Sequence, residues 1–493
     1  MGFIERYGLW NDEQAGLAAD LKLQVASKDL QMVRLAWADP HGASRAKSVS
    51  LPAFLGALEE GYNINVATST LDGAGGRVFR SFVRGGGMGL DEMTGSPNLI
   101  IVPDPATFRV LPWASGVGWV LCDEYFVDGT PFHFSPRRLL RTQLARLAER
   151  DLGHVVGLES EWYLAHGPEA RLTDENIGAP GLRGRAVETV PVEQGYSLHS
   201  ETGLDIMQPV LDRLVAAYQE VGLSLRSIEN EWGPGQVECT FEPQDALAAA
   251  DNYVLFRTAT RQLCRRLGFF ATFMARPGKP GHYSSGWHLH QSVIETRTGK
   301  NVFMAQGGDE PLSELGRKFL AGLLEHCVAA TVFSTPTVNG YRRFRPNSLA
   351  PDRASWGIDH RGALMRVLGG AGDEATRIEN RGGEPAANPY LFIASQIAAG
   401  LDGIDRGLEL GPPDDAPYEA ERPLLPAGLG AAVDVLDDSA FFRARFGDLF
   451  VDYYIAFKRA EWARFRQYCE NNGIDDQPDV VTQWEQDEYY DFF

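Results

Sequence analysis

Cysteine is scarce in this sequence, and the few cysteines form no recognisable pattern. The 493 residues contain five of them, an odd number, and no two stand in a C-x-x-C arrangement. A disulfide framework or a zinc–cysteine site needs paired or clustered cysteines, so both are excluded. Scattered cysteines are typical of a reducing compartment, and we expect a cytoplasmic protein. The five are Cys122, Cys239, Cys264, Cys327 and Cys469.

Long apolar runs and an excess of basic charge are also missing. No run approaches the roughly 18–20 apolar residues that span a bilayer. The opening residues lack the basic flank and apolar stretch of a signal peptide. The 46 Lys and Arg residues against 66 Asp and Glu residues give a formal net charge of −20. This balance argues against nucleic acid or an anionic membrane as the main partner, so we expect small-molecule substrates.

The length and apolar content predict a large folded protein of at least two units. A single domain usually stops growing near roughly 250–300 residues, and an apolar fraction of 44% supplies a sizeable core. Strand-like runs fill the first quarter, and long helices alternate with strands from about residue 130. We predict an α+β fold with a small strand-rich domain over residues 1–125 and a large domain over 126–493. The expected long helices lie at 136–150, 205–221, 246–267, 313–331 and 441–472.

Four short segments of the large domain hold closely spaced polar residues in strand-like surroundings. Residues two apart on a strand face the same way, so Glu159 and Glu161 present two carboxylates on one side. The same spacing relates His288 to His290. Taken alone, a carboxylate pair on a strand is more often a solvated face than a site, and a lone H-x-H pair is equally ambiguous. The remaining two segments are the turn-containing run 231–238, with Glu231 and Glu238 at its ends, and the row Arg377, Glu379 and Arg381.

Together these segments indicate metal-dependent chemistry. Several carboxylates and an imidazole are the ligands expected for Mg²⁺ or Mn²⁺. Arginines beside such a cluster suit a transferring phosphoryl group, because its charge spreads over several oxygens. The residues alone therefore favour metal-dependent phosphoryl transfer from a nucleotide. Further arginines available for anion binding are Arg342, Arg343, Arg361 and Arg366.

The chain resembles the glutamine synthetase superfamily over essentially its whole length. The stretches that carry the resemblance, in the family's order, are GLESEWYL, ENEWGPGQVE, SSGWHLHQS, NGYRRFRP and RIENRGGEPAANPYLFIASQIAAGLDGI. The resemblance implies a small β-grasp N-terminal domain and a large catalytic domain with a curved antiparallel sheet flanked by helices. It also implies ATP as a co-substrate with Mg²⁺ or Mn²⁺. Finally, it implies a homo-oligomer, either a hexameric ring or a double-ring dodecamer, with active sites shared between subunits.

The resemblance also implies roles for individual positions. The metal ligands would be Glu159, Glu161, Glu231, Glu238, His288 and Glu379. The nucleotide would be contacted by His290, Ser292 and Arg377. The catalytic group would comprise Asp72, Glu231, and the phosphate-holding Arg361 and Arg366. The substrates would be bound by Arg343, which grips the α-carboxylate of glutamate, and by Arg381, Tyr196, Ser284 and Leu349.

Departures from the family pattern carry the information on the amine. The family's ammonium pocket normally holds an aspartate and a serine from a neighbouring subunit, a tyrosine, and a glutamate on a flap. Asp72 and Tyr196 match two of these, whereas Gly75 takes the place of the serine and Leu349 that of the flap glutamate. A Tyr-Ser pair at 283–284 replaces an asparagine–glycine pair that helps hold glutamate. The pocket becomes larger and less polar, which disfavours ammonium and favours an apolar amine.

The predicted function is that of an ATP-dependent ligase. It would join the γ-carboxyl of L-glutamate to a primary amine through a γ-glutamyl phosphate. The amine would be apolar or aromatic, like aniline, as in the γ-glutamylamide-forming branch of the family that serves amine catabolism. The alternatives are glutamine synthesis from ammonium, a ligase for short alkylamines, and a catalytically inactive structural relative. Tyr418 lies near the position at which some bacterial members are adenylylated, and such regulation stays open.

Overall fold

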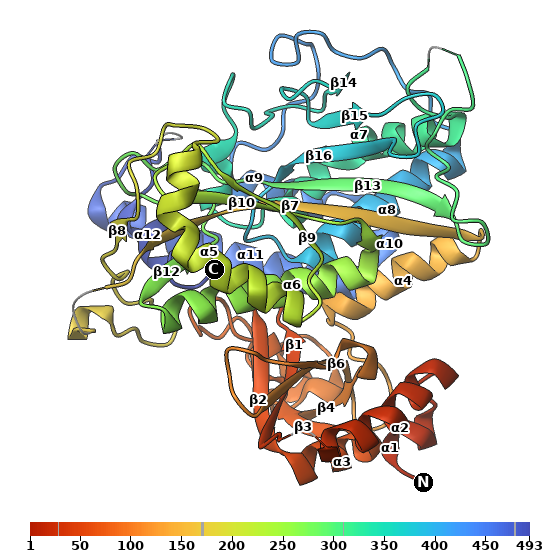
Figure 1. Ribbon diagram of the computed structural model, residues 1–493, viewed down its shortest axis with the longest axis vertical. Helices are drawn as coiled ribbons and strands as arrows, with labels where there is room; N and C mark the ends of the chain where they lie inside the picture. Colours follow the sequence, from red (N-terminus) through yellow and green to blue (C-terminus); the bar gives the residue numbers. More distant parts are fainter. Residues whose placement is uncertain (28, 169–171, 309, 478–479) are drawn as a thin grey trace.

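The computed structural model describes residues 1–27, 29–168, 172–308, 310–477 and 480–493. A six-stranded sheet near the N-terminus forms the lower part of the molecule in Figure 1, and a ten-stranded sheet lies in the larger upper part. Strands and helices are mixed in both parts, so the predicted α+β fold is confirmed. The domain boundary at 125/126 stays a prediction. Among the described residues, no helix has both the length and the apolar character needed to cross a membrane.

The small sheet is assembled from strands that are far apart in the sequence. Its order is β2-β1-β6-β4-β3, with β5 paired to β6 at the side. The β1–β6 pair is parallel, and the other pairs are antiparallel. The strands are β1 (Met32–Ala38), β2 (Ser44–Ser50), β3 (Tyr62–Asn65), β4 (Asn98–Pro103), β5 (Arg109–Val110) and β6 (Val117–Tyr125).

The large sheet runs in the order β14-β15-β16-β13-β7-β10-β9, with β8, β11 and β12 also paired to β7. All of its pairs are antiparallel except β14–β15. The long strand β7 therefore lies at the centre of the larger part. The strands are β7 (Leu152–His166), β8 (Val190–Pro191), β9 (Leu225–Asn230), β10 (Gln236–Phe241), β11 (Gln244–Asp245), β12 (Phe269–Thr272), β13 (Trp287–Glu295), β14 (Trp356–Ile358), β15 (Met365–Leu368) and β16 (Arg377–Gly383).

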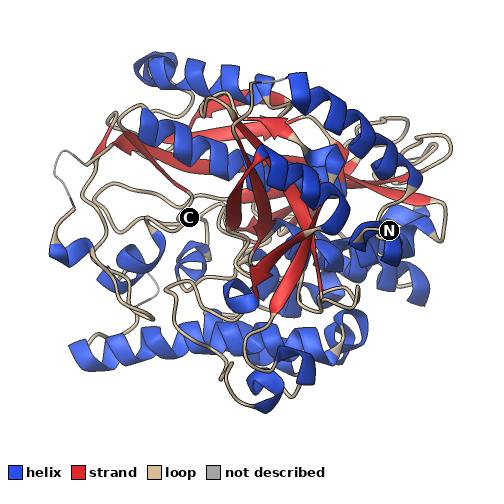
Figure 2. Cartoon of the chain, turned by 90° about the horizontal axis from the view of Figure 1, so that it is seen from below, coloured by secondary structure: helices blue, strands red, loops and turns tan. Residues whose placement is uncertain are grey.

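Helices lie around the strands, as Figure 2 shows. Those in the first part of the chain are α1 (Phe3–Tyr7), α2 (Asp12–Ser27), α3 (Leu51–Glu60), α4 (Pro136–Ala148), α5 (Glu201–Glu220) and α6 (Ala246–Arg266). Those that follow are α7 (Glu314–Ser334), α8 (Pro389–Arg406), α9 (Leu429–Asp437), α10 (Ala440–Phe446), α11 (Asp448–Asn472) and α12 (Gln483–Tyr489).

The helical region expected over residues 441–472 is present as two helices, α10 and α11. Gly447 separates α10 from α11 and has φ +87° with ψ 141°, a conformation outside the helical region. Glycine reaches such angles without the steric cost of a Cβ, so the chain changes direction there. The aromatic side chains of α11 pack into the core, as the spacing predicts. These buried residues are Phe450, Tyr453, Tyr454 and Phe457.

Candidate active site

Strand register brings the predicted acidic and imidazole groups together on one face of the large sheet. Glu161 of β7 stands opposite Glu238 of β10, and Glu159 stands opposite His288 of β13. Because alternate residues of a strand share a face, Glu159 and Glu161 both point to this side. On the next strand, β16, Glu379 stands opposite His290. Six residues from four strands that are distant in the sequence therefore meet at the centre of the sheet.

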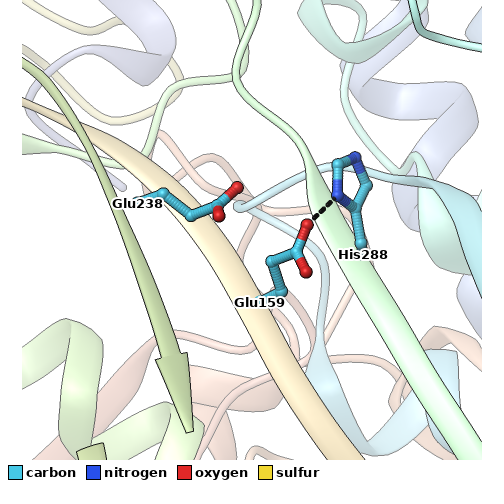
Figure 3. Close-up of side chains that lie close together, drawn as sticks. All are labelled: Glu159, Glu238 and His288. Carbon is cyan, nitrogen blue, oxygen red and sulfur yellow. Dashed lines mark hydrogen bonds and ion pairs between the residues drawn. The ribbon is translucent and has the colours of Figure 1, made fainter. Parts of the chain in front are cut away.

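Figure 3 shows Glu159, Glu238 and His288 directed toward one another. The Nδ1 atom of His288 lies 2.5 Å from Oε1 of Glu159. Ligand atoms of these three residues all lie within 4.8 Å of one another, which is close enough to hold one metal ion. Glu159, His290 and Glu379 form a second such group. Carboxylate oxygens with an imidazole nitrogen suit a divalent cation such as Mg²⁺ or Mn²⁺. We call the residues of these two groups, together with Glu161, the carboxylate cluster.

Negative charge in the cluster is only partly balanced by the protein. Burial, followed by repulsion from neighbouring glutamates, raises the pKa of Glu161 to about 8 and that of Glu238 to about 10. In contrast, His288 and His290 hold the pKa of Glu159 far below its usual value, although burial opposes this. A buried carboxylate without a cation prefers to be protonated, whereas a bound divalent ion favours the ionised form. The donor set therefore fits a divalent cation.

Arginines line the β15–β16 side of the cluster. Arg366 of β15 donates to Oε2 of Glu379 at 3.0 Å and to Asp359. Arg381 donates to Oε1 of Glu379 and, at 3.0 Å, to the carbonyl oxygen of Arg361. The side chain of Arg361 is exposed. Two buried guanidinium groups thus lie beside Glu379, and the backbone of Arg361 adjoins them, an arrangement suited to binding phosphate oxygens.

Arg343 is buried and has no carboxylate within ion-pair distance in the described part of the chain. It donates a hydrogen bond to the carbonyl oxygen of Gly382 at 3.1 Å. Burial lowers its pKa to about 10, and the nearby Glu161 opposes this shift. A buried guanidinium stabilised by so few protein groups is well suited to bind a substrate carboxylate.

Gly286, immediately before β13, permits a close approach that sequence reasoning missed. A Cβ at this position would lie 2.9 Å from Nε2 of His288 and 3.0 Å from Nη2 of Arg343. It would also lie 3.4 Å from Oε1 of Glu161. The absence of a side chain therefore lets the carboxylate cluster and Arg343 lie close to the backbone of Gly286. Glycine within a strand-like segment often marks such a close approach, so this signal could have indicated the position.

The three predicted nucleotide residues line one cavity of about 750 Å³ beside the cluster. Arg377 donates from Nε to Nδ1 of His290 at 3.2 Å, so Nε2 of His290 carries the proton donated to Glu159 at 2.9 Å. Ser292 lies on the same strand as His290. Arg226 and Lys300 add positive charge to the wall, although neither stood out in the sequence. Arg226 stands on β9, and Lys300 lies just after the turn that follows β13, so the two come from distant parts of the chain.

The charge of Glu231 contributes to the raised pKa of Glu161 and of Glu238, and Glu231 also lies beside two residues that were not predicted. Its Oε1 lies 3.9 Å from Nε2 of His199, and Glu229 lies 3.2 Å from the same nitrogen. These three groups form a third set with ligand atoms within 4.8 Å. Burial raises the pKa of Glu231. His199 and Glu229 were missed, although Glu229 lies only two residues before Glu231 in an acidic run that could have indicated it.

The remaining predicted residues stand on loops. Tyr196 is 54% exposed and donates to the carbonyl oxygen of Gly281 at 2.8 Å. Leu349 is 59% exposed and has φ +63°, the left-handed region that a leucine rarely adopts. It belongs to residues 345–351, which we call the flap. Ser284 contributes a carbonyl oxygen that accepts from Gln236 at 3.2 Å, and Gln236 also donates to Glu161.

Asp72 is not brought to the carboxylate cluster within this chain. It is buried, it accepts from the backbone of Ala74 and Gly76, and its carboxylate lies 3.0 Å from Nε of Arg464 on α11. The neighbouring Gly75 has φ +75°. A glycine rather than a serine fits this left-handed position, which supplies a local reason for the departure from the family pattern.

Comparison with known proteins agrees with this geometry. Residues 133–476 match the family model described as the glutamine synthetase catalytic domain. The chain is 43% identical to a γ-glutamylanilide synthase of an Acinetobacter species over 99% of both chains. It is 32% identical to a γ-glutamylethanolamide synthetase of Streptomyces coelicolor, covering 90% of this chain and 92% of that one. The solved structure of GmaS without ligand superposes with a TM-score of 0.76 at 27% identity, covering 94% and 98% of the two chains.

Proposed function

The chain belongs to the glutamine synthetase family, and from this premise we propose that it joins the γ-carboxyl of L-glutamate to an apolar or aromatic primary amine. It is an ATP-dependent glutamate–amine ligase. The observation that carries the proposal is the 43% identity to a γ-glutamylanilide synthase over 99% of both chains. The exposed Leu349, where the family has a glutamate, supports an apolar amine over ammonium.

The mechanism proceeds through activation of a carboxylate. Phosphate is a far better leaving group than a carboxylate oxygen, so ATP first phosphorylates the γ-carboxyl and the amine then displaces phosphate. In our proposal, Arg343 binds the α-carboxylate of glutamate, because it is buried and has no acidic partner in the described residues. Arg361 and Arg366 hold the transferring phosphoryl group, and Arg381 lies beside the acyl phosphate.

The carboxylate cluster, together with Glu231, would hold the divalent cations that enzymes of this family use. We propose Glu159, Glu161, Glu231, Glu238, His288 and Glu379 as their ligands and Mg²⁺ or Mn²⁺ as the metal. When bound, such an ion supplies positive charge that offsets the negative charge on phosphate oxygens. The residues of this chain orient that site: Gln236 holds Glu161 and Arg366 holds Glu379. His290, Ser292 and Arg377 would contact the nucleotide in the adjoining cavity.

The test is a panel of amines with the purified protein. Phosphate release from ATP is measured with glutamate and, in turn, aniline, a short alkylamine and ammonium. We expect the highest kcat/KM for aniline or a compact apolar amine, because Leu349 offers an apolar contact and arylamines arrive uncharged at neutral pH. Preference for ammonium would indicate a glutamine synthetase instead. Absence of glutamate-dependent turnover with every amine would indicate an inactive relative.

We propose a homo-oligomer, a hexameric ring or double ring, in which Asp72 serves the site of a neighbouring subunit. Support comes from the position of Asp72, which contacts Arg464 rather than the carboxylate cluster of its own chain. Subunits carrying Asp72→Ala, mixed with subunits carrying Arg361→Ala, should recover part of the activity that each lacks. Confirmed subunit exchange without any recovery would exclude a shared site. We propose the cytoplasm as the compartment, since all five cysteines are free and buried.

A further inference from the structure

Two tyrosines from distant segments of the chain contact the flap from either end. The hydroxyl of Tyr283 donates to the carbonyl oxygen of Ser348 at 3.4 Å, and the hydroxyl of Tyr418 donates to that of Ala350 at 3.5 Å. Leu349 lies between these two acceptors. Both tyrosines are half-buried. The flap backbone around the exposed Leu349 is therefore held by two tyrosines that have no function in the proposed mechanism.

Tyr283 is fixed close to the carboxylate cluster. Its backbone N–H donates to the hydroxyl of Tyr163 at 2.8 Å, and its carbonyl oxygen accepts from the same hydroxyl at 3.0 Å. Tyr163 is buried in the central strand β7. The next residue, Ser284, is tied to Gln236, which donates to Glu161. The ring of Tyr283 thus extends from the edge of the metal-binding groups toward the flap.

Tyr418 is fixed on the opposite side, next to the arginines. A Cβ at Gly362 would lie 3.2 Å from Cε2 of Tyr418, so the ring packs directly on the backbone that follows Arg361. The segment that contains Tyr418 is held by Arg353, which lies just before β14 and donates to the carbonyl oxygen of Ala420 at 2.9 Å. The hydroxyl is directed to the flap and is half-buried, an environment that favours a structural contact over modification at this position.

The flap itself is conformationally strained at the position between the tyrosines. Asn347 and Leu349 have φ +60° and +63°, left-handed angles that are unfavourable for a bulky residue such as leucine. Ser348 compensates in part, because its hydroxyl donates to the carbonyl oxygens of Arg343 and Arg345. The result is an exposed apolar side chain on a backbone whose two flanking carbonyl oxygens accept from the tyrosine hydroxyls. Covering the exposed Leu349 side chain with an apolar ligand would lower the free energy of the protein.

We propose that Tyr283 and Tyr418 determine amine specificity by holding the flap and presenting aromatic surface, together with Leu349, to the side chain of an aromatic amine. This inference rests on the proposed function. Aromatic rings favour other rings in stacked or edge-to-face contact. Ammonium has no side chain to contact them, so its use should depend on the two rings far less than the use of aniline does.

The experiment measures kcat/KM for aniline and for ammonium in six proteins: the wild type, Tyr283→Ala, Tyr418→Ala, Tyr283→Phe, Tyr418→Phe and the control Tyr468→Ala on α11. The readout is the aniline-to-ammonium ratio, which a general loss of folding or of glutamate binding does not move. We expect each Tyr→Ala change at the flap to lower this ratio about 10-fold or more. The Tyr→Phe changes keep the ring and remove one hydrogen bond, so they should lower it by about two- to fivefold. The control should leave the ratio unchanged.

Equal losses for aniline and ammonium in both Tyr→Ala variants would overturn the inference. The proposed function would then still stand, provided that the wild type uses aniline better than ammonium. Conversely, a wild type that prefers ammonium would overturn the proposed function, whatever the variants do. If an alanine variant fails to fold, the two phenylalanine variants still decide: an unchanged ratio in both excludes flap anchoring by the hydroxyl groups.

Discussion

On the metal-binding side of the candidate site the functional groups stand on paired strands, whereas on the amine side they stand on loops. Glu159, Glu238 and His288 are fixed by the register of β7, β10 and β13. Tyr196 and Leu349 are more than half exposed, and both have positive φ. A rigid strand can hold charged groups at the fixed separations that phosphoryl transfer needs, while a loop can change side chain and shape without disturbing them. Because the two sets of residues stand on different elements, the amine that is used can change without a change in the residues that carry the reaction.

The largest effect should follow from removing a ligand on the strand side. Glu238→Ala should lower kcat by at least about 10³-fold, because a weakened metal site loses several kcal/mol of charge stabilisation. Steady-state turnover with saturating ATP, glutamate and Mn²⁺ measures this. Glu242→Ala, an exposed glutamate just after β10, is the matched control and should retain normal turnover. Full activity of Glu238→Ala in the presence of a chelator would show that the strand side does not act through a bound metal.

The second effect concerns Gly286, whose backbone lies close to both His288 and Arg343. Gly286→Ala places a methyl group within about 3 Å of His288 and Arg343, so one of them must move. A displacement of this kind should cost about 10²-fold in kcat/KM for glutamate, since catalysis depends closely on geometry. Gly56→Ala in α3 is the control, because a Cβ there meets no atom within 4 Å. Unchanged kinetics in Gly286→Ala would show that the strand side tolerates displacement.

A change on the loop side should alter the preference between amines more than it alters the overall rate of the reaction. Leu349→Glu restores the family's carboxylate and should shift the aniline-to-ammonium ratio of kcat/KM toward ammonium. An apolar contact of this size supports about 10–200-fold discrimination. Val127→Glu, an equally apolar and exposed position in the small sheet region, is the control. Paired kinetics with both amines measure the shift, and a ratio that stays constant would remove Leu349 from the specificity argument.

The smallest effect should be seen in thermal unfolding. A metal at about 100 times its Kd stabilises the folded state by about 2.7 kcal/mol, and a chain of this size should gain about a few degrees in Tm. The gain from Mn²⁺ should persist in Leu349→Glu and vanish in Glu238→Ala, because only the latter removes a proposed ligand. Calorimetry with and without Mn²⁺ tests this. An equal gain in both variants would place the metal outside the carboxylate cluster.

The sequence already indicated the α+β fold and the acidic groups of the strand side. The i, i+2 spacing of Glu159 with Glu161 and of His288 with His290 is a local property, and the structure places each pair on one face. Prediction was weaker where conformation departs from regular periodicity. The helical region over 441–472 is present, but its division at Gly447 was not predicted, because the apolar spacing continues on both sides of that residue.

By itself the sequence determined which residues can carry charge, which way alternate strand residues face, and which family the motifs resemble. Only the tertiary structure decided that Glu159 meets His288, that Arg343 keeps no acidic partner among the described residues, and that Tyr283 and Tyr418 converge on the flap. The physical reason is the range of the interactions. Backbone periodicity depends on neighbours in the chain, whereas strand pairing and loop contacts depend on how distant segments bury their apolar surface together.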